Sequence, residues 1–440
     1  MRRVIVLGAG GRDFHDFAVV LRDDPGVQVV AFTAAQIPGI DDRRLPSSIA
    51  GPAYPEGIPI RPQAELTPLI REHHVDEVVL SYSDLSYADV MHLAAEVLAA
   101  GADFRLLGPD RTMLRSSKPV VAVCASRTGA GKSQTTRRIG RILLDAGLRV
   151  ALVRHPMPYG DLEAMRVQRF ATLDDIAASH PTIEEREEYE LPVSEGMVMF
   201  AGVDYEAILR AAAAEADVIV WDGGNNDLPF VRPDVMVTVL DALRPGHERG
   251  WHPGEVNLRL ADVVVVNKID AAAPSDIGVL LDNVRRLAPT AVVVQAASPV
   301  VLADGPSIAG GRVLVVEDGP TITHGGMPFG AGTVAARAAG AAELVDPRPY
   351  ARGSIADTFE RYPHIGPVLP AMGYGEDQLS DLAATIAAVP CDVVVTGTPI
   401  DLTRVIALDR PVRHASYSLR EVSRPDLAEV LAPHVRAWRP

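Results

Sequence analysis

The stretch Val120–Ser133, VVAVCASRTGAGKS, carries the residues best suited to chemistry. Its apolar first half, Val120–Ala125, predicts a strand, and the Gly-rich second half predicts a phosphate-binding loop that runs into a helix, QTTRRIGRILLDAGL. Backbone N–H groups of such a loop meet phosphate oxygens at the start of the helix. We expect Lys132 to reach the β- and γ-phosphates and the Ser133 hydroxyl to hold Mg²⁺. Ser126 stands where the usual motif has its first Gly, and it is small enough to allow the turn.

Lysine usage supports this prediction independently. The chain has 42 Lys and Arg residues, yet lysine occurs only at Lys118, Lys132 and Lys268. Lys132 and Lys268 lie in nucleotide motifs, where a compact ammonium fits and a planar guanidinium does not. Arg serves wherever a generic surface cation is needed.

Two later strands end in residues that belong with a phosphate loop. Val218–Asp222 (VIVWD) is an apolar strand that ends in a carboxylate, which is how Mg²⁺ is held from its second side. The strand Val263–Val266 continues into Asn267, Lys268, Ile269 and Asp270, which match the N-K-x-D base-reading motif of GTP-binding proteins. A helix N-cap at Asp270 is the alternative reading. The nucleotide-binding residues predicted from both motifs are Gly129, Ala130, Gly131, Lys132, Ser133, Gln134, Asn267, Lys268 and Asp270.

Three loops that follow strands share a composition of His, Arg, Gly and Pro. They are HPMPYGD (155–161), RPGHER (244–249) and THGGMPFGAG (323–332). In an open α/β sheet the ligand crevice lies at the carboxyl ends of the strands, so these loops should converge beside the phosphate loop. We expect them to form a cationic, anion-binding pocket, although for any single His a structural hydrogen bond is the commoner role. The side chains concerned are Arg154, His155, Arg244, His247, Arg249, His252 and His324.

The acidic run 184–190 (EEREEYE) leaves two alternatives open. It is either a solvated helix face or the source of a functional carboxylate.

Alternating β and α patterns predict an α/β protein built on parallel sheets. The first, Rossmann-like domain covers residues 1–117, with strands at 2–8, 27–33, 77–81 and 104–108, helices at 66–73 and 87–100, and an ordered loop at 37–62. Its dinucleotide fingerprint is incomplete: Asp13 replaces the third glycine, and Thr33 ends the second strand in place of an acidic residue. A tight turn, or a small anion site with Arg12 and His15 at its mouth, is expected instead.

A phosphate-loop NTPase domain is predicted for residues 118–345, with strands at 149–154, 218–222, 235–241, 263–266 and 312–317 and helices at 206–216 and 333–344. A small C-terminal α/β segment, 346–440, begins with a linker (346–363). It has a strand near Val368, strands at 392–396 and 413–417, and helices at 376–389 and 400–407. We expect this segment to be too short for a large core and to pack on the central domain or extend its sheet.

Composition limits the class of partner. A net charge of −15 argues against nucleic acid and anionic membranes, so any anionic substrate needs a local cationic cluster. Cys124 and Cys391 are too few and too far apart for a disulfide framework or a cysteine metal site. No apolar run is long enough to span a membrane and no signal peptide is evident, which favours a cytoplasmic protein. Because the first domain needs a role other than cofactor binding, we expect it to support assembly, as a homodimer, or substrate entry.

Taken together, the motifs ASRTGAGKS, LVRHPMPYGDL, WDGGNNDLPF, LRPGHE, HPGE, VVNKID and THGGMPFGAG, with GAGGRDFHDF near the start, resemble cyclic 2,3-diphosphoglycerate synthetase over most of the chain. The central domain looks like the signal-recognition and MinD-like (SIMIBI) class of phosphate-loop proteins. Members of that class often carry a second basic residue early in the loop, and Arg127 takes that position here.

The resemblance implies an ATP-dependent ligase that closes a phosphoanhydride within 2,3-diphosphoglycerate and releases ADP and phosphate. It implies catalytic roles for Lys132, Arg127 and Asp222, and Mg²⁺ ligation by Ser133 and Asp222. The implied substrate contacts are Arg154, His155, Arg244, His247, Glu248 and His324. GTP in place of ATP stays open because of the N-K-x-D motif. A regulatory or metallochaperone-type GTPase is the alternative function.

Overall fold

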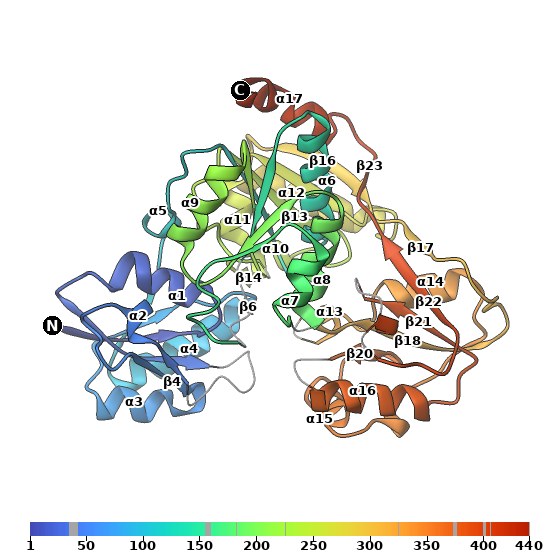
Figure 1. Ribbon diagram of the computed structural model, residues 1–440, viewed down its shortest axis with the longest axis horizontal. Helices are drawn as coiled ribbons and strands as arrows, with labels where there is room; N and C mark the ends of the chain where they lie inside the picture. Colours follow the sequence, from blue (N-terminus) through green and yellow to red (C-terminus); the bar gives the residue numbers. More distant parts are fainter. Residues whose placement is uncertain are drawn as a thin grey trace.

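Three sheets organise the protein, and each comes from a different part of the chain (Figure 1). In this view the N-terminal sheet (blue) lies at lower left, the central sheet (green) above, and the C-terminal sheet (orange) at lower right. The computed structural model describes residues 1–34, 43–154, 160–181, 183–224, 226–323, 325–372, 376–398, 402–404 and 406–439.

The central sheet has nine strands in the order β10-β11-β9-β12-β8-β13-β15-β16-β23. It is parallel except for its two end pairs, β10–β11 and β16–β23. Valine-rich runs form its middle because a parallel strand is covered by helices on both faces and gains by burying every side chain. The strands are β8 (Val120–Ala125), β9 (Val150–Val153), β10 (Gln168–Phe170), β11 (Val198–Ala201), β12 (Val218–Asp222), β13 (Val235–Asp241), β15 (Val263–Asn267), β16 (Val292–Ala297) and β23 (Arg420–Glu421).

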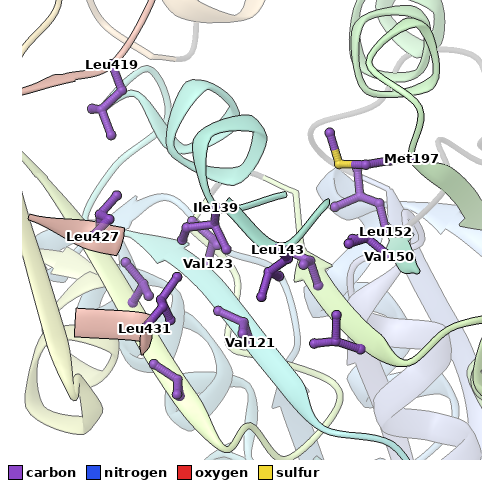
Figure 2. Packing of buried hydrophobic residues seen from close by; sticks show 14 of the residues in the cluster. Val121, Val123, Ile139, Leu143, Val150, Leu152, Met197, Leu419, Leu427 and Leu431 are labelled. Atoms are coloured by element: carbon purple, nitrogen blue, oxygen red, sulfur yellow. The ribbon is translucent and has the colours of Figure 1, made fainter. Parts of the chain in front are cut away.

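Helix α6 (Lys132–Asp145) follows the phosphate loop and packs on this sheet. Ile139 and Leu143, four residues apart, share one face of the helix and are fully buried with the β8 side chains Val121 and Val123 (Figure 2). Leu431, from the C-terminal helix, reaches the same core. The helices of the central part are α6, α7 (Leu173–Ala178), α8 (Ile183–Ser194), α9 (Tyr205–Glu215), α10 (His247–Gly250), α11 (Gly254–Leu260), α12 (Pro274–Leu287) and α17 (Leu427–Trp438).

The N-terminal sheet has the order β3-β4-β2-β1-β5-β7 and is parallel except for the β3–β4 pair. Its strands are β1 (Arg2–Leu7), β2 (Val27–Ala34), β3 (Arg44–Leu45), β4 (Ile58–Pro62), β5 (Glu77–Leu80) and β7 (Asp103–Leu106). The helical segments are α1 (Arg12–Asp16), the π-helical turn η1 (Phe17–Leu21), α2 (Ser47–Ala50), η2 (Gln63–Glu65), α3 (Leu66–Glu72), α4 (Tyr87–Ala100) and α5 (Pro109–Thr112). Helix α4 begins where Ser86 and Asp89 form a capping box, and it ends at Gly101 in the left-handed conformation.

The C-terminal sheet has the order β17-β22-β21-β18-β19, with β20 also paired to β18. Its strands are β17 (Val300–Leu302), β18 (Arg312–Asp318), β19 (Glu343–Leu344), β20 (Leu369–Ala371), β21 (Val393–Gly397) and β22 (Val412–Tyr417). Around it lie α13 (Gly319–Ile322), α14 (Ala331–Ala338), η3 (Arg348–Tyr350), α15 (Ser354–Arg361), α16 (Glu376–Ala388) and η4 (Leu402–Arg404).

Two short strand pairings link the three parts of the chain. Strand β6 (Leu85–Ser86) of the N-terminal part pairs with β14 (Trp251–His252) of the central part. After the C-terminal sheet is complete, the chain returns to add β23 and α17 to the central layer.

The α/β class and most of the predicted elements are confirmed, but five expectations need correction. The expected loop 37–62 contains β3, α2 and β4, and β4 pairs in parallel with β2. The expected helix 333–344 ends at Ala338, where Gly340 in the left-handed conformation stops it. The linker 346–363 contains helix α15, and the expected helix 400–407 is the short turn η4 within its described residues.

The fifth correction concerns the C-terminal part. Its sheet begins with β17 at Val300, well before the expected boundary at 346. Strand β18, which we expected in the nucleotide domain, belongs to this sheet and not to the nine-stranded one. With β18 included, this part buries a large apolar core of its own, contrary to the expectation of a small one. In the described residues, no helix is both long and apolar enough to cross a membrane.

We predict that Leu143→Ala lowers the free energy of unfolding by about 2–5 kcal/mol, because it opens a cavity in the core between helix α6 and the central sheet. Asp145→Ala, on the same helix at an exposed position, should change it by less than about 0.5 kcal/mol. Urea denaturation followed by circular dichroism measures both, and equal effects of the two variants would contradict this packing.

Candidate functional site

The phosphate loop joins β8 to α6 and depends on one glycine in particular. Gly131 is the N-cap of α6 and has φ = 106°, a left-handed conformation that side-chain-bearing residues rarely adopt. A Cβ placed there would lie 2.1 Å from the Asn267 amide nitrogen and 2.6 Å from that of Gln134. Only glycine lets these side chains approach the loop so closely.

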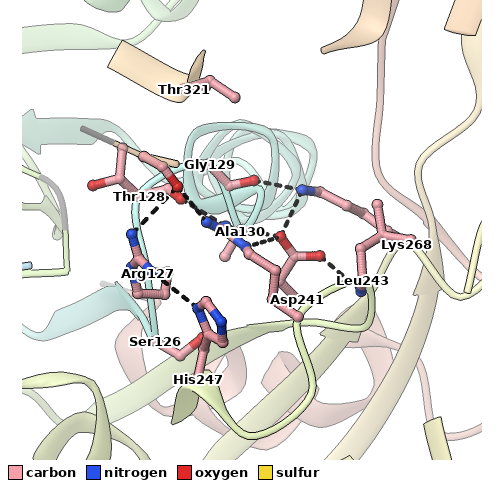
Figure 3. A network of polar contacts seen from close by, with 12 residues as sticks. Ser126, Arg127, Thr128, Gly129, Ala130, Asp241, Leu243, His247, Lys268 and Thr321 are labelled. Carbon is pink, nitrogen blue, oxygen red and sulfur yellow. Dashed lines mark hydrogen bonds and ion pairs between the residues drawn. The ribbon is translucent and has the colours of Figure 1, made fainter. Parts of the chain in front are cut away.

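The loop is held from behind through its carbonyl groups (Figure 3). Arg244 donates to the Thr128 carbonyl at 2.7 Å, and Lys268 donates to the Gly129 carbonyl at 2.6 Å. Asn267 donates to the Ala130 carbonyl at 2.9 Å. The N–H of the next residue points opposite to each carbonyl because the peptide unit is planar and trans. The N–H groups of Gly129 and Gly131 therefore face away from these donors, on the side where a phosphate would bind.

Asp241, at the end of β13, holds two of these donors in place. Its Oδ2 accepts from Lys268 Nζ at 2.9 Å and from Arg244 Nε at 2.9 Å. Burial by itself would raise the pKa of Asp241, but the two cations bring it below its ordinary value. Asp241 is therefore ionised and compensates the charges beneath the loop.

Arg127 is buried and ties the loop to the N-terminal part. Its Nε donates to Asp84 Oδ1 at 2.7 Å, and its Nη1 donates to His247 Nδ1 at 2.9 Å. The guanidinium carbon lies 3.3 Å from the ring centroid of Trp251. Asp84 follows β5 of the N-terminal sheet, so Arg127 connects the phosphate loop of the central sheet to the N-terminal sheet.

A chain of charges lies beside the loop. Lys132 Nζ forms an ion pair with Asp222 Oδ1, and Arg154 Nη1 contacts Asp222 Oδ2 at 2.7 Å. Arg154 also pairs with Glu188 on helix α8. Burial would raise the pKa of Asp222, but Lys132 and Arg154 together lower it below its ordinary value. Glu188, in the acidic run 184–190, is thus a carboxylate turned toward the loop and not part of a solvated helix face.

A cavity of about 720 Å³ opens in front of the loop and is lined by all three parts of the protein. The N-terminal part contributes the turn after β1 and the residues after β5, and the C-terminal part contributes the ends of β18, β21 and β22. The charged side chains lining it, among the described residues, are the cations Arg12, Arg127, Lys132, Arg137, Arg154, Lys268 and Arg361 and the carboxylates Asp13, Glu188, Glu195, Asp227, Asp270 and Asp318. The two signs are nearly balanced.

The predicted site residues divide between this cavity and its support. Those that line the cavity are Arg127, Gly129, Gly131, Lys132, Ser133, Gln134, Arg154, Lys268 and Asp270. Ala130 is fully buried in the loop, and Asn267 lies behind it. Asp222 lies beneath Lys132 and Arg154 and does not line the cavity.

Three expected substrate contacts have structural roles instead. Arg244 is buried, and its guanidinium is used by Asp241 and by the carbonyls of Thr128 and Gly325. Glu248 is buried, accepting from the Gly246 N–H at 2.9 Å and from Asn283. His247 accepts from Arg127 and is absent from the cavity lining. Sequence position after a strand does not reveal which side chains turn behind the loop.

The expected cationic histidine cluster is also corrected. Burial, with Arg127 and Arg244 nearby, lowers the pKa of His247 to about 4, and burial lowers that of His252 to about 4. Both are therefore neutral at pH 7, and Arg249 is exposed and outside the cavity lining. His155 and His324 lie outside the described residues.

The N-terminal turn also differs from the small anion site considered from sequence. Asp13 accepts from the N–H groups of Gly10, Gly11 and Phe14, so a carboxylate already occupies the turn. His15 is buried, bonded to the Thr112 carbonyl at 2.6 Å, and burial lowers its pKa to about 3. Arg12 alone of the two expected residues reaches the cavity.

Comparison with known proteins identifies the family. The arginine synthetase ArcE of Thermococcus kodakarensis is 55% identical to this chain over 430 residues, which cover 98% of the chain and 96% of the relative. The chain belongs to the family of this arginine synthetase. No protein-family model matches it. LpxK from Aquifex aeolicus, solved in complex with ATP, aligns with a TM-score of 0.41 and 12% identity over 74% of this chain and 90% of that one, a likeness too weak to support an argument.

This relationship corrects the function expected from the motifs. A close, nearly full-length relative carries the name of arginine synthetase, so the assignment to cyclic 2,3-diphosphoglycerate synthesis is wrong. The alternative of a regulatory or metallochaperone-type GTPase is not what the relative's name describes either. Motifs shared between two families do not by themselves tell which acceptor is bound.

We predict that Lys132→Ala reduces nucleotide turnover at least about 100-fold, because a positioned cation on the transferred phosphoryl group is lost. The fold should persist, since Asp222 keeps its contact with Arg154. Phosphate release and the circular dichroism melting curve measure the two effects. Lys118→Ala, at a lysine outside the cavity lining, is the control, and a folded Lys132→Ala protein with unchanged turnover would refute the role of this lysine.

Proposed function

We propose that this protein is an ATP-dependent synthetase that forms arginine. The proposal rests on the near full-length relationship to an arginine synthetase. Two features of the chain support it: a phosphate loop with its supporting residues in place, and a cavity before that loop large enough for a nucleotide and an amino acid.

The chemistry follows from the product. The guanidinium group of arginine differs from the ureido group of citrulline by one nitrogen in place of one oxygen. That oxygen cannot leave a ureido carbon unaided, but it leaves readily as phosphate. A loop of this type places a lysine at the β- and γ-phosphates, so we infer transfer of the γ-phosphoryl group to the ureido oxygen.

Two balanced steps then complete the reaction. First, the ureido oxygen attacks the γ-phosphorus, and the bond from that phosphorus to the bridging oxygen breaks, releasing ADP. Second, ammonia attacks the ureido carbon, the carbon–oxygen bond breaks, and phosphate leaves with the electron pair and takes the surplus proton of ammonia. Ammonia is the simplest donor, because an amino-acid donor would leave its carbon skeleton attached and require a further elimination.

The residues beside the loop suit this role. Lys132 lines the cavity and can stabilise charge on the phosphoryl group. Arg127 also lines it, but Asp84, His247 and the Gly325 carbonyl already use its guanidinium, so we expect it to act by holding the loop in place. Ser133 and Asp222 provide the hard oxygen ligands that Mg²⁺ takes together with phosphates and water, although Asp222 must first release a contact to Lys132 or Arg154. Bound there, Mg²⁺ would neutralise phosphate charge. No cluster of three or more His, Cys, Asp or Glu side chains in the described ranges could hold a metal by itself.

The charge balance of the cavity favours this acceptor. Seven cations against six carboxylates among the described lining residues suffice for one nucleotide with Mg²⁺, but leave little to neutralise a second polyanion. Citrulline is a zwitterion with a neutral side chain and brings no net charge. It therefore fits the lining without further cations.

The strand order supports a position for the nucleobase. Asp270 and Ser298 come after the neighbouring strands β15 and β16, and both line the cavity. Asp270 Oδ1 accepts from the Ser298 N–H at 3.0 Å. We place the base beside these residues. ATP is our proposal for the nucleotide, and GTP is the comparison that the N-K-x-D motif requires.

We predict that the protein converts citrulline, ammonium and ATP to arginine and ADP in a 1:1 ratio, with no AMP. Arginine is measured by amino-acid chromatography and the nucleotides by anion exchange, with GTP run in parallel. Arginine formation should require all three substrates and disappear in Lys132→Ala. Absence of arginine with either nucleotide, or formation of AMP, would overturn the proposed function or its mechanism, respectively.

A further inference from the structure

The residues that line the cavity lie on both sides of the phosphate loop, and we call these two sides its arms. In the central sheet β12 adjoins β8 on one side, whereas β13, β15 and β16 follow on the other. The base side is therefore the arm beside Asp270 and Ser298. The opposite arm lies between the loop after β12 and the N-terminal part, where Gly8–Gly10 and Ser81–Ser83 line it. These segments follow β1 and β5, at the carboxyl ends where α/β sheets bind ligands.

Asp227 lies in this second arm and is held rigidly. Its neighbour Asn226 donates through Nδ2 to the Ser126 carbonyl, at the start of the phosphate loop, at 3.0 Å. On its other side, the Leu228 carbonyl accepts from Arg12 Nη1 at 3.2 Å. The Asp227 N–H also closes a turn onto the Gly224 carbonyl at 3.0 Å. The loop after β12 thus places Asp227 between the phosphate loop and the N-terminal part.

The carboxylate of Asp227 is buried without a cation of its own. It is 7% exposed, lines the cavity, and forms no ion pair with any described side chain. Burial raises its pKa, and Arg12, Ser83 and then Lys132 act in the opposite direction. Asp227 and Lys132, the lysine expected at the γ-phosphate, line the same cavity. A buried carboxylate in such a position is stabilised by a ligand that brings a positive charge and N–H donors.

We propose that Asp227 binds the nitrogen end of the acceptor, contacting the ureido N–H groups of the substrate and the guanidinium as it forms. This inference rests on the proposed function and assigns the acceptor to the N-terminal arm. The ureido group is neutral and the guanidinium is a cation, so a buried carboxylate favours the second over the first. Asp227 therefore stabilises the charge that develops when ammonia replaces phosphate.

The test compares Asp227→Asn with the wild-type protein. Isothermal titration calorimetry should show that the variant binds arginine about 30-fold or more weakly, citrulline no more than about 5-fold more weakly, and ATP within about 3-fold of wild type. The selective loss distinguishes a charge contact from general damage to the cavity. Asp103→Asn, at an exposed aspartate on β7, should leave all three affinities unchanged.

A second measurement uses the wild-type protein alone, in case Asp227→Asn does not fold. Without nucleotide it should bind arginine at least about 10-fold more tightly than citrulline, because only arginine supplies a cation. Equal affinities, or an Asp227→Asn variant that loses arginine and citrulline binding equally or neither, would overturn the assignment. If the wild-type protein makes no arginine at all, the proposed function fails instead, whatever the binding results.

Discussion

The rest of the structure depends on one constraint, the hydrogen bonds that hold the carbonyl groups of the phosphate loop from behind. Peptide units at Thr128, Gly129 and Ala130 are each held by a different donor, Arg244, Lys268 and Asn267. With the carbonyls held behind the loop, its N–H groups can face the cavity. A phosphate site built this way is preorganised, because the loop does not have to rearrange when charge arrives.

Holding the loop in this way places several charges in the interior, and the structure compensates each of them. Asp241 pairs with Lys268 and Arg244, Asp84 pairs with Arg127, and Asp222 pairs with Lys132 and Arg154. A buried charge without a partner is costly, so these pairs fix where β13, β12 and the N-terminal part meet. The same pairs hold the central and N-terminal sheets at one cavity, and Arg244 reaches the C-terminal part through the Gly325 carbonyl.

How much the sequence predicts depends on whether a feature is local. The runs Val120–Ala125, Val218–Asp222 and Val235–Asp241 were predicted with correct bounds, because a valine-rich strand buried on both faces is recognisable without its neighbours. The place of Arg312–Asp318 was not, since nothing within that strand tells which sheet it joins. Strands β3 and β4 were missed because they are short and lie among prolines and glycines.

The same distinction applies to the site. Lys132 and Ser133 could be placed from the motif, because its spacing alone fixes where they lie. Arg244 and His247 could not, since their roles depend on Asp241 and Arg127, which reach them only in the folded chain. Asp227 had one signal, its place after a strand that ends in Asp222. It lies within one of the shared motifs, and such motifs do not tell which acceptor is bound, so they led to the wrong substrate.

The central claim is that ATP activates the ureido oxygen by phosphorylation. It is tested most directly with citrulline carrying ¹⁸O in the ureido group, ammonium and unlabelled ATP, followed by phosphorus NMR of the released phosphate. If the account is correct, every phosphate formed with arginine carries one ¹⁸O atom, seen as the isotope shift of its resonance. Phosphate without the label, alongside arginine formation, would contradict the account.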